Sequence, residues 1–141
     1  MVTSNCPGRD AIYASDDSVL TWWQPQLDDN EPCITFVLGK KTSYRIESYR
    51  IIWRDINMEV LDGIMPGPFQ YLVEYTGDPE AREWKVLVNA SGNQKDLCID
   101  YRQFEPVEAY SVRLRITGSP ENIEPGVVSF TVFGRCVHVC K

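Results

Sequence analysis

The sequence predicts an all-β domain, a sandwich or a barrel of strands, from three observations. Short segments alternate apolar and polar residues with a period of two, which is the period of a β-strand with one buried face. Turn-forming Gly, Pro, Asp and Asn residues separate these segments at short intervals. No segment carries the i, i+3, i+4, i+7 apolar spacing of an amphipathic helix, so helix is expected only in short turns.

Two segments show the strand pattern most clearly, Phe69–Tyr75 and Tyr110–Ile116. The residues predicted to face the core are Phe69, Tyr71, Val73 and Tyr75 of the first, and Tyr110, Val112, Leu114 and Ile116 of the second. Ser111, Arg113 and Arg115 are then expected to face outward. Further strands are predicted at Cys33–Leu38, Ile46–Trp53, Trp84–Val88 and Val127–Phe133. Leu61–Pro68 is expected to be a loop because two prolines and two glycines interrupt it.

The length and composition fit one compact domain. The chain has 141 residues, of which 43% are hydrophobic and 24% charged, so residues 1–141 are expected to share one core. The formal net charge is −6, so nucleic acid and anionic membrane lipid are not expected as partners, and neutral ligands fit better. No apolar run approaches the roughly 18 residues that a membrane-spanning helix requires.

The five cysteines are an odd set, so at least one stands outside any intrachain disulfide. Their spacing matches no standard zinc-ligand pattern. A disulfide between Cys6 and either Cys136 or Cys140 would join the two ends of the chain. Buried reduced thiols are the other interpretation, and the sequence favours them slightly.

Several motifs, taken in order, resemble the discoidin family, also called coagulation-factor type C or galactose-binding-like domains. Asp16–Trp23 is similar to the family's early Asp-Gly-x-x-x-Thr-x-Trp loop, and Ile34–Gly39 is similar to its strand ending in Leu-Gly. Tyr71–Asp78, followed by Trp84, is similar to its Tyr-x-Val-Glu-x-Ser-x-Asp hairpin. The later strands that match are Val112–Thr117 and Phe130–Gly134. The resemblance covers nearly the whole chain and implies a jelly-roll β-sandwich of two antiparallel sheets.

The second half of the chain has a closer likeness. Pro66–Phe69, Ile99–Val107 and Ile123–Val127 resemble the accessory module that follows the catalytic domain in some family 43 glycoside hydrolases. This resemblance implies that the chain is a fragment of a larger bacterial glycosidase, with Met1 added for expression.

The early loop is a candidate calcium site. Discoidin-like sugar-binding modules often hold a structural calcium ion there, with the loop Asp, the Thr and a Glu that begins the last strand as ligands. The resemblance gives Asp16 and Thr21 that role, and Ser18 adds a nearby hydroxyl oxygen, a ligand type that calcium accepts. At the position of the Glu this chain has Ser129. The alternative is that Asp16 and Ser18 only hold a turn through side-chain-to-backbone hydrogen bonds, so one structural calcium and no metal both remain open.

Trp22 and Trp23 are expected to have different roles, because neighbouring residues of an extended segment point in opposite directions. Trp23 holds the packing position of the discoidin family and is expected in the core. An exposed indole face stacks on the apolar face of a sugar ring, so Trp22 is the predicted sugar platform. Tyr13 and the pair Tyr101 and Arg102 are alternative stacking and hydrogen-bonding residues.

Family 32 carbohydrate-binding modules, which share this fold, place an Arg and an Asn in the loop after a central strand. The sequence Ile-Trp-Arg-Asp-Ile-Asn that ends at Asn57 is similar, so the resemblance implies that Arg54 and Asn57 donate to sugar hydroxyls and that Asp55 accepts. In the loop Gly118–Gly126, related modules often bring an aromatic residue over the ligand, whereas this chain offers Asn122. The alternative for Arg54 and Asp55 is a surface ion pair worth at most about 1 kcal/mol.

The residue set favours binding over catalysis. The single histidine, His138, lies near the end of the sequence without a nucleophile-elbow motif, so a Ser-His-Asp or Cys-His hydrolase is not expected. The leading hypothesis is a non-catalytic module of a plant-polysaccharide-degrading glycosidase that binds a poly- or oligosaccharide weakly through loops at one end of the sandwich. The alternative is an accessory domain that packs against the catalytic domain and binds no glycan.

Overall fold

The computed structural model describes residues 2–4, 14–15, 22–25, 31–56, 68–120 and 124–137. The strands formed by these residues are β1 (Val2–Ser4), β2 (Cys33–Val37), β3 (Tyr44–Ile56), β4 (Gln70–Thr76), β5 (Lys85–Ala90), β6 (Ile99–Ala109), β7 (Ser111–Gly118) and β8 (Glu124–Cys136). The described part of the chain forms no α-helix, as the sequence predicts, and so contains no helix that could cross a membrane.

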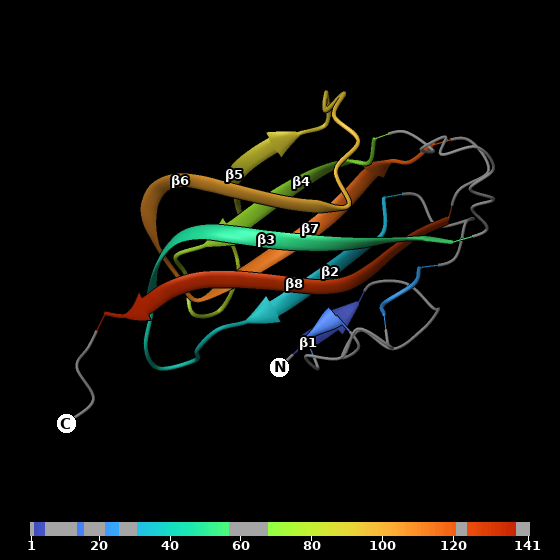
Figure 1. Cartoon of the computed structure of the whole chain (residues 1–141). Helices are drawn as coiled ribbons and strands as arrows, with labels where there is room; N and C mark the ends of the chain where they lie inside the picture. The colour runs from blue at the N-terminus through green and yellow to red at the C-terminus, as the bar shows by residue number, and fades with distance from the viewer. Residues whose placement is uncertain are drawn as a thin grey trace.

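The strands form two sheets that lie face to face (Figure 1). The five-stranded sheet has the order β1-β2-β7-β4-β5, and the three-stranded sheet has the order β6-β3-β8. Every described strand pair is antiparallel. The predicted sandwich of two antiparallel sheets is therefore confirmed.

Aromatic side chains from both sheets meet in the core. The rings of Phe36 on β2 and Phe130 on β8 stack with centroids 5.0 Å apart, and Tyr49 on β3 lies 5.8 Å from Phe130. The Trp53 ring stacks on that of Phe69, the residue just before β4, with centroids 4.7 Å apart. Such pairs bury large apolar areas and fix the distance between the two sheets.

The predicted strands are confirmed, with corrections to their ends and to one residue. Tyr71, Val73, Val112 and Leu114 are fully buried, as their alternation requires. Ser111, which was expected to face outward, is buried, because it pairs with β2 on one side and with β4 on the other. The predicted β3 and β8 segments are too short, since both strands run for 13 residues.

Strand β6 was not predicted from the alternation, because its pattern is inverted. Asp100 is buried, whereas the neighbouring Ile99 and Tyr101 are 57% and 53% exposed. The strand lies at an edge of the three-stranded sheet, where its outer face has no covering layer in the described structure. Hydrogen bonds with β3 hold this first part of the strand, and farther along Phe104, Val107 and Ala109 pack on the core.

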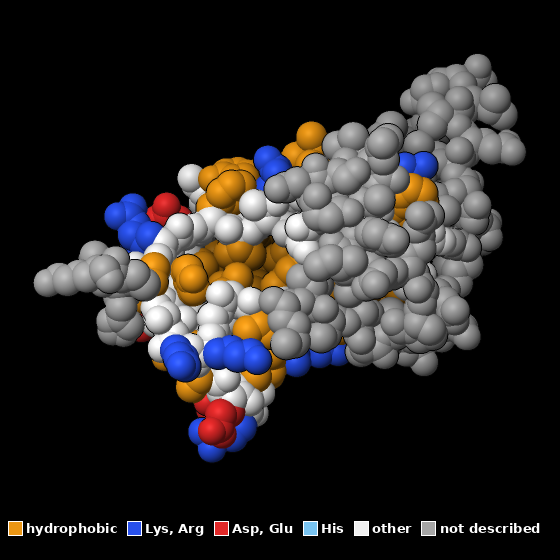
Figure 2. All heavy atoms as spheres, turned by 90° about the horizontal axis from the view of Figure 1, so that it is seen from below, with side chains coloured by type: hydrophobic (Ala, Val, Ile, Leu, Met, Phe, Trp, Pro, Cys, Tyr) orange, Lys and Arg blue, Asp and Glu red, His pale blue; other side chains and the backbone are white. Residues whose placement is uncertain are grey.

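The two sheets part at one edge, where a cavity of about 290 Å³ opens into the core. Leu38, Tyr44, Ile46, Val132 and Gly134 line it. Figure 2 shows apolar side chains gathered in a hollow on this face. At Gly134 a Cβ atom would lie 2.3 Å from the carbonyl oxygen of Arg45, so the close approach of β8 to β3 requires glycine.

Two predictions lie largely outside the described residues. Of the expected loop Leu61–Pro68 the structure describes only Pro68, which is in no strand. The disulfide considered between Cys6 and either Cys136 or Cys140 is not tested, because Cys6 and Cys140 lie outside the described residues. Cys33 is buried, and this burial raises the pKa of its thiol.

Candidate functional site

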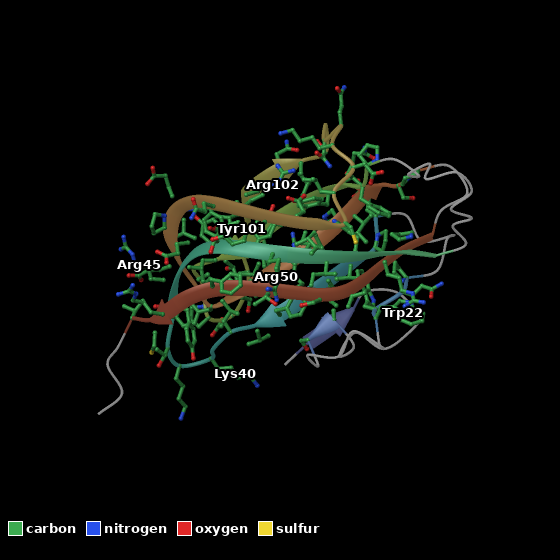
Figure 3. All side chains as sticks on the ribbon, viewed as in Figure 1. Trp22, Lys40, Arg45, Arg50, Tyr101 and Arg102 are labelled. Atoms are coloured by element: carbon green, nitrogen blue, oxygen red, sulfur yellow. The ribbon has the colours of Figure 1, made fainter. Side chains whose placement is uncertain are left out.

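The structure brings together two of the predicted site residues, Trp22 and Arg54. The Cζ atom of Arg54 lies 3.8 Å from the centroid of the Trp22 ring, so the guanidinium group rests on the indole face. Trp22 is half-buried and Arg54 is exposed. Figure 3 shows Trp22 at one end of the sandwich. We call this pair the Trp22–Arg54 patch.

Backbone pairing with β8 places both residues of the patch. Trp23 exchanges two hydrogen bonds of 2.8 Å with Val127, and Val127 pairs on its other side with Trp53 of β3. Trp23 and Trp53 are both buried. Trp22 directly precedes Trp23 and Arg54 directly follows Trp53, so both side chains face away from the core. This confirms the predicted opposite directions of Trp22 and Trp23.

A β-bulge and a glycine help the two side chains to meet. The pairing of β3 with β8 shifts register between Ile52 and Trp53, and such bulges redirect the strand and its side chains. Beyond the bulge, Arg54 pairs with Gly126 of β8. Because Gly126 carries no side chain, no side chain of β8 stands directly opposite Arg54. Trp22 and Arg54 are 32 positions apart in the sequence, so only the fold determines this contact.

Hydrogen bonding fixes the indole ring and leaves the guanidinium group available. The Trp22 Nε1–H donates to the Oε1 atom of Gln24 at 3.0 Å, which limits rotation of the ring. Arg54 forms no ion pair among the residues that the structure describes. Stacking uses the face of the guanidinium group, so its N–H donors at the edge remain free to meet a ligand. Gln24 was not predicted, because nothing in the sequence distinguishes it from other polar residues near a Trp.

The remaining predicted site residues are only partly described. Arg54 and Asp55 were expected in a loop after a central strand, but both belong to β3, which continues to Ile56 because its pairing with β8 extends to Glu124. The expected loop Gly118–Gly126 is shortened in the same way, since β8 begins at Glu124. The residues of the prediction that lie outside the described part are Asn57, Asn122, Asp16, Ser18 and Thr21. Within the described ranges, no three His, Cys, Asp or Glu side chains are grouped as a metal site.

A second group of functional side chains lies on β6. Tyr101, named from the sequence as an alternative stacking residue, is 53% exposed on the outer face of the three-stranded sheet. Its ring lies 6.2 Å from that of Phe133 on β8, which is 38% exposed. Figure 3 shows Tyr101, Arg50 and Arg102 over the three-stranded sheet, away from Trp22. The sequence did not indicate Phe133, because strand alternation alone does not say which face of a sheet is open.

A chain of hydrogen bonds runs from the core to Arg102. Tyr71 donates from its hydroxyl to Asp100 Oδ2 at 2.6 Å, and the hydroxyls of Tyr49 and Tyr71 are 2.9 Å apart. Arg102 donates from Nε and Nη2 to the two oxygens of Asp100, at 3.0 and 3.3 Å. Burial raises the pKa of the Tyr71 and Tyr49 hydroxyls well above their usual range, so both stay protonated donors. The hydrogen bonds with Asp100 raise the pKa of Arg102.

Comparison with known proteins identifies relatives by structure but not by sequence. No family model matches the chain, and no curated protein sequence matches it. A family 32 carbohydrate-binding module of Clostridium perfringens, named CpGH89CBM32-6, superposes with a TM-score of 0.76 at 16% identity, over 95% of this chain and 92% of the module. Chitosan-binding module 2 of a chitosanase/glucanase from Paenibacillus sp. IK-5, solved with chitotriose, gives a TM-score of 0.76 at 17% identity, over 95% of each chain.

The same fold also occurs as part of a longer chain. A protein named as an α-L-fucosidase of Bacteroides thetaiotaomicron superposes with a TM-score of 0.67 at 20% identity. The match covers 97% of this chain and 28% of that one. At these identities the similarity defines the fold, which is the galactose-binding-like β-sandwich that carbohydrate-binding modules have.

Proposed function

We propose that this chain is a non-catalytic carbohydrate-binding module that holds a neutral glycan weakly at the Trp22–Arg54 patch. The observation that carries the proposal is the stacked indole and guanidinium pair at one end of a sandwich whose structural relatives include modules named for sugar binding. The net charge of −6 also favours a neutral ligand over an anionic polymer.

The chemistry of the patch suits a sugar ring. The Trp22 indole supplies an aromatic surface beside the N–H groups of Arg54, and the C–H groups of a pyranose stack on such a surface. The Arg54 N–H groups then donate to hydroxyl oxygens at the edge of that ring. Because Gln24 and Arg54 already hold the indole in place, binding costs little additional side-chain ordering. From the sequence resemblance, we assign further hydroxyl contacts to Asp55, Asn57 and Asn122.

The biological role in this proposal is to keep a glycoside hydrolase near a plant polysaccharide. A tethered module raises the effective concentration of the enzyme at its substrate without taking part in the chemical step. The occurrence of the fold within a chain named as a fucosidase supports such an arrangement. The assignment to a family 43 enzyme rests on the sequence motifs Pro66–Phe69, Ile99–Val107 and Ile123–Val127 alone. A structural calcium held by Asp16, Ser18 and Thr21 is part of the same proposal.

Affinity gel electrophoresis with soluble xylan, arabinan and galactan tests the proposal. The wild-type chain should be retarded by at least one of the three. Trp22→Ala and Arg54→Ala should weaken retention about ten-fold or more, which corresponds to about 1.4 kcal/mol of binding free energy.

The chain offers a matched control for these variants. Arg113 lies over the Trp84 ring at 4.2 Å, which is the same type of contact on the five-stranded sheet. Trp84→Ala should therefore bind like the wild type. If the wild type binds none of the three polysaccharides, the module is better explained as a domain that packs against its catalytic partner. Equal loss of binding in the Trp84 and Trp22 variants would also refute the assignment of the site.

A further inference from the structure

A cleft of about 640 Å³ lies along the free edge of β6, beside the connection between β5 and β6. Since β6 is an edge strand, the cleft receives side chains from both of its faces, Asp100 and Arg102 from one and Tyr101 and Gln103 from the other. Its volume is within the range of about 300–1,000 Å³ that is typical of small-molecule sites. The Trp22–Arg54 patch contributes no residue to it.

One wall of the cleft is a loop held in a fixed conformation by Asn93. The Nδ2 group of Asn93 donates to the carbonyl oxygens of Phe69 and Lys95, each at 3.0 Å. The backbone N–H of Lys95 donates back to Asn93 Oδ1 at 3.2 Å, and Gln70 Nε2 donates to the Asn93 carbonyl at 2.9 Å. A wall that is already ordered reduces the entropy lost on binding.

The inner side of the cleft presents an oriented hydrogen-bond donor. The Asp100 side chain is 3% exposed, and Arg102 and Tyr71 occupy its two oxygens. Arg102 uses Nε and Nη2 for this ion pair, so both N–H groups of Nη1 remain without a partner among the described residues. The charges of Asp100 and Arg102 cancel each other, and Lys95 is the remaining charged residue of the lining. Most of the lining is polar and uncharged, which suits a hydroxyl-rich ligand.

The rim of the cleft presents an aromatic platform. Tyr101 is 53% exposed, and its ring is supported by Phe133 at 6.2 Å. The Arg50 Cζ atom lies 5.8 Å from the Phe133 ring on the same outer face. The cleft is therefore lined by an aromatic residue from the outer face of β6 and by an N–H donor from its inner face, two kinds of group that recognise a sugar.

The platform and the Trp22–Arg54 patch lie on one face of the three-stranded sheet. Arg50, Ile52 and Arg54 alternate with buried residues of β3 and so all point outward. Arg50 pairs with Tyr101 and Ile52 pairs with the exposed Ile99. At about 3.3 Å per residue, the four steps from Arg50 to Arg54 span about 13 Å. Among the described residues, Ile52, Ile99 and Ser129 form the face between the two positions, and none of the three is charged.

We propose that Tyr101 and Arg102 form a second carbohydrate subsite, and that one linear polysaccharide chain contacts it and the Trp22–Arg54 patch together across the outer face of β3. This inference rests on the proposed function of the patch. Tyr101 stacks on a neutral pyranose, and Arg102 Nη1 donates to its hydroxyls. Linking two weak contacts through one polymer raises the affinity for the polymer above the affinity for a short oligosaccharide.

Calorimetric titration of the full chain tests this subsite. The titrants are the polysaccharide that retards the wild type and a short oligosaccharide made from it. The wild type should bind the oligosaccharide at a second site per chain, which Tyr101→Ala removes. The same variant should weaken polysaccharide binding about ten-fold. Tyr101→Phe keeps the ring and should bind like the wild type. Val86→Ala, which trims a 54% exposed apolar residue on the other sheet, is the matched control.

The outcomes separate the two proposals. Unchanged polysaccharide affinity in Tyr101→Ala, with Trp22→Ala still impaired, would overturn the second subsite and leave the proposed function intact. Equal loss in Tyr101→Ala and Val86→Ala would also overturn it. A wild-type chain that binds no polysaccharide would overturn both proposals.

Discussion

The buried hydroxyl chain between Tyr49, Tyr71 and Asp100 gives a stability prediction whose direction follows from hydrogen-bond chemistry. An ionised carboxylate only accepts hydrogen bonds, so the single hydroxyl hydrogen of Tyr71 is committed to Asp100 at 2.6 Å. The 2.9 Å contact between the two tyrosines must then be donated by Tyr49. All three residues are at most 2% exposed, so water does not replace a lost partner.

This order of donation makes the two Tyr→Phe changes unequal. Tyr71→Phe removes a bond to a charged acceptor, worth about 1.5–3 kcal/mol, and leaves the Tyr49 hydroxyl buried without an acceptor, which costs about 1–3 kcal/mol more. Tyr49→Phe removes one neutral hydrogen bond, worth about 1 kcal/mol. We therefore expect losses of about 3–5 kcal/mol for Tyr71→Phe and about 1 kcal/mol for Tyr49→Phe.

Urea unfolding at pH 7, followed by circular dichroism, measures both losses and the loss in the double variant. The double variant should be no less stable than Tyr71→Phe alone, because removing the Tyr49 hydroxyl also removes its unsatisfied donor. Equal losses in the two single variants, or additive losses in the double variant, would refute this direction of hydrogen bonding.

Three further predictions concern parts of the molecule outside this chain of hydrogen bonds. Burial alone would raise the pKa of Glu74, but hydrogen bonds from Arg113 and Arg115 outweigh it and lower the pKa. Glu74→Gln should therefore lower the free energy of unfolding by about 1–2 kcal/mol at pH 7. Thermal melting at several pH values should show that the difference between the variant and the wild type disappears as the pH falls below about 4, because Glu74 is then protonated as the pH passes through its lowered pKa. Gly134→Ala should lower the melting temperature by several degrees because its Cβ meets the backbone of β3, whereas Gly92→Ala, with no atom within 4 Å of its Cβ, should not. Calcium in the early loop should raise the melting temperature by several degrees over the chelated protein, and identical melting curves would exclude it.

Period-two alternation was sufficient to predict an all-β sandwich or barrel, because it reports which residues a sheet buries, and the discoidin resemblance pointed to the sandwich. Tyr71, Val73, Val112 and Leu114 follow that pattern and are fully buried. The same rule gave opposite directions to Trp22 and Trp23, which the structure confirms. The alternation fails at the start of β6, where Asp100 is buried and Tyr101 is exposed, because hydrogen bonds from Tyr71 and Arg102 make the burial of a carboxylate possible.

The assembly of the site was beyond the reach of local sequence rules. The sequence by itself determined that Trp22 points away from the core and that Arg54 directly follows Trp53, the last residue of a predicted strand. Only the tertiary structure decided that the two meet, since Val127 pairs with Trp23 on one side and with Trp53 on the other. It likewise decided that Tyr101 and Phe133 lie together on the open face, because register between distant strands is set by the packing of the whole sandwich.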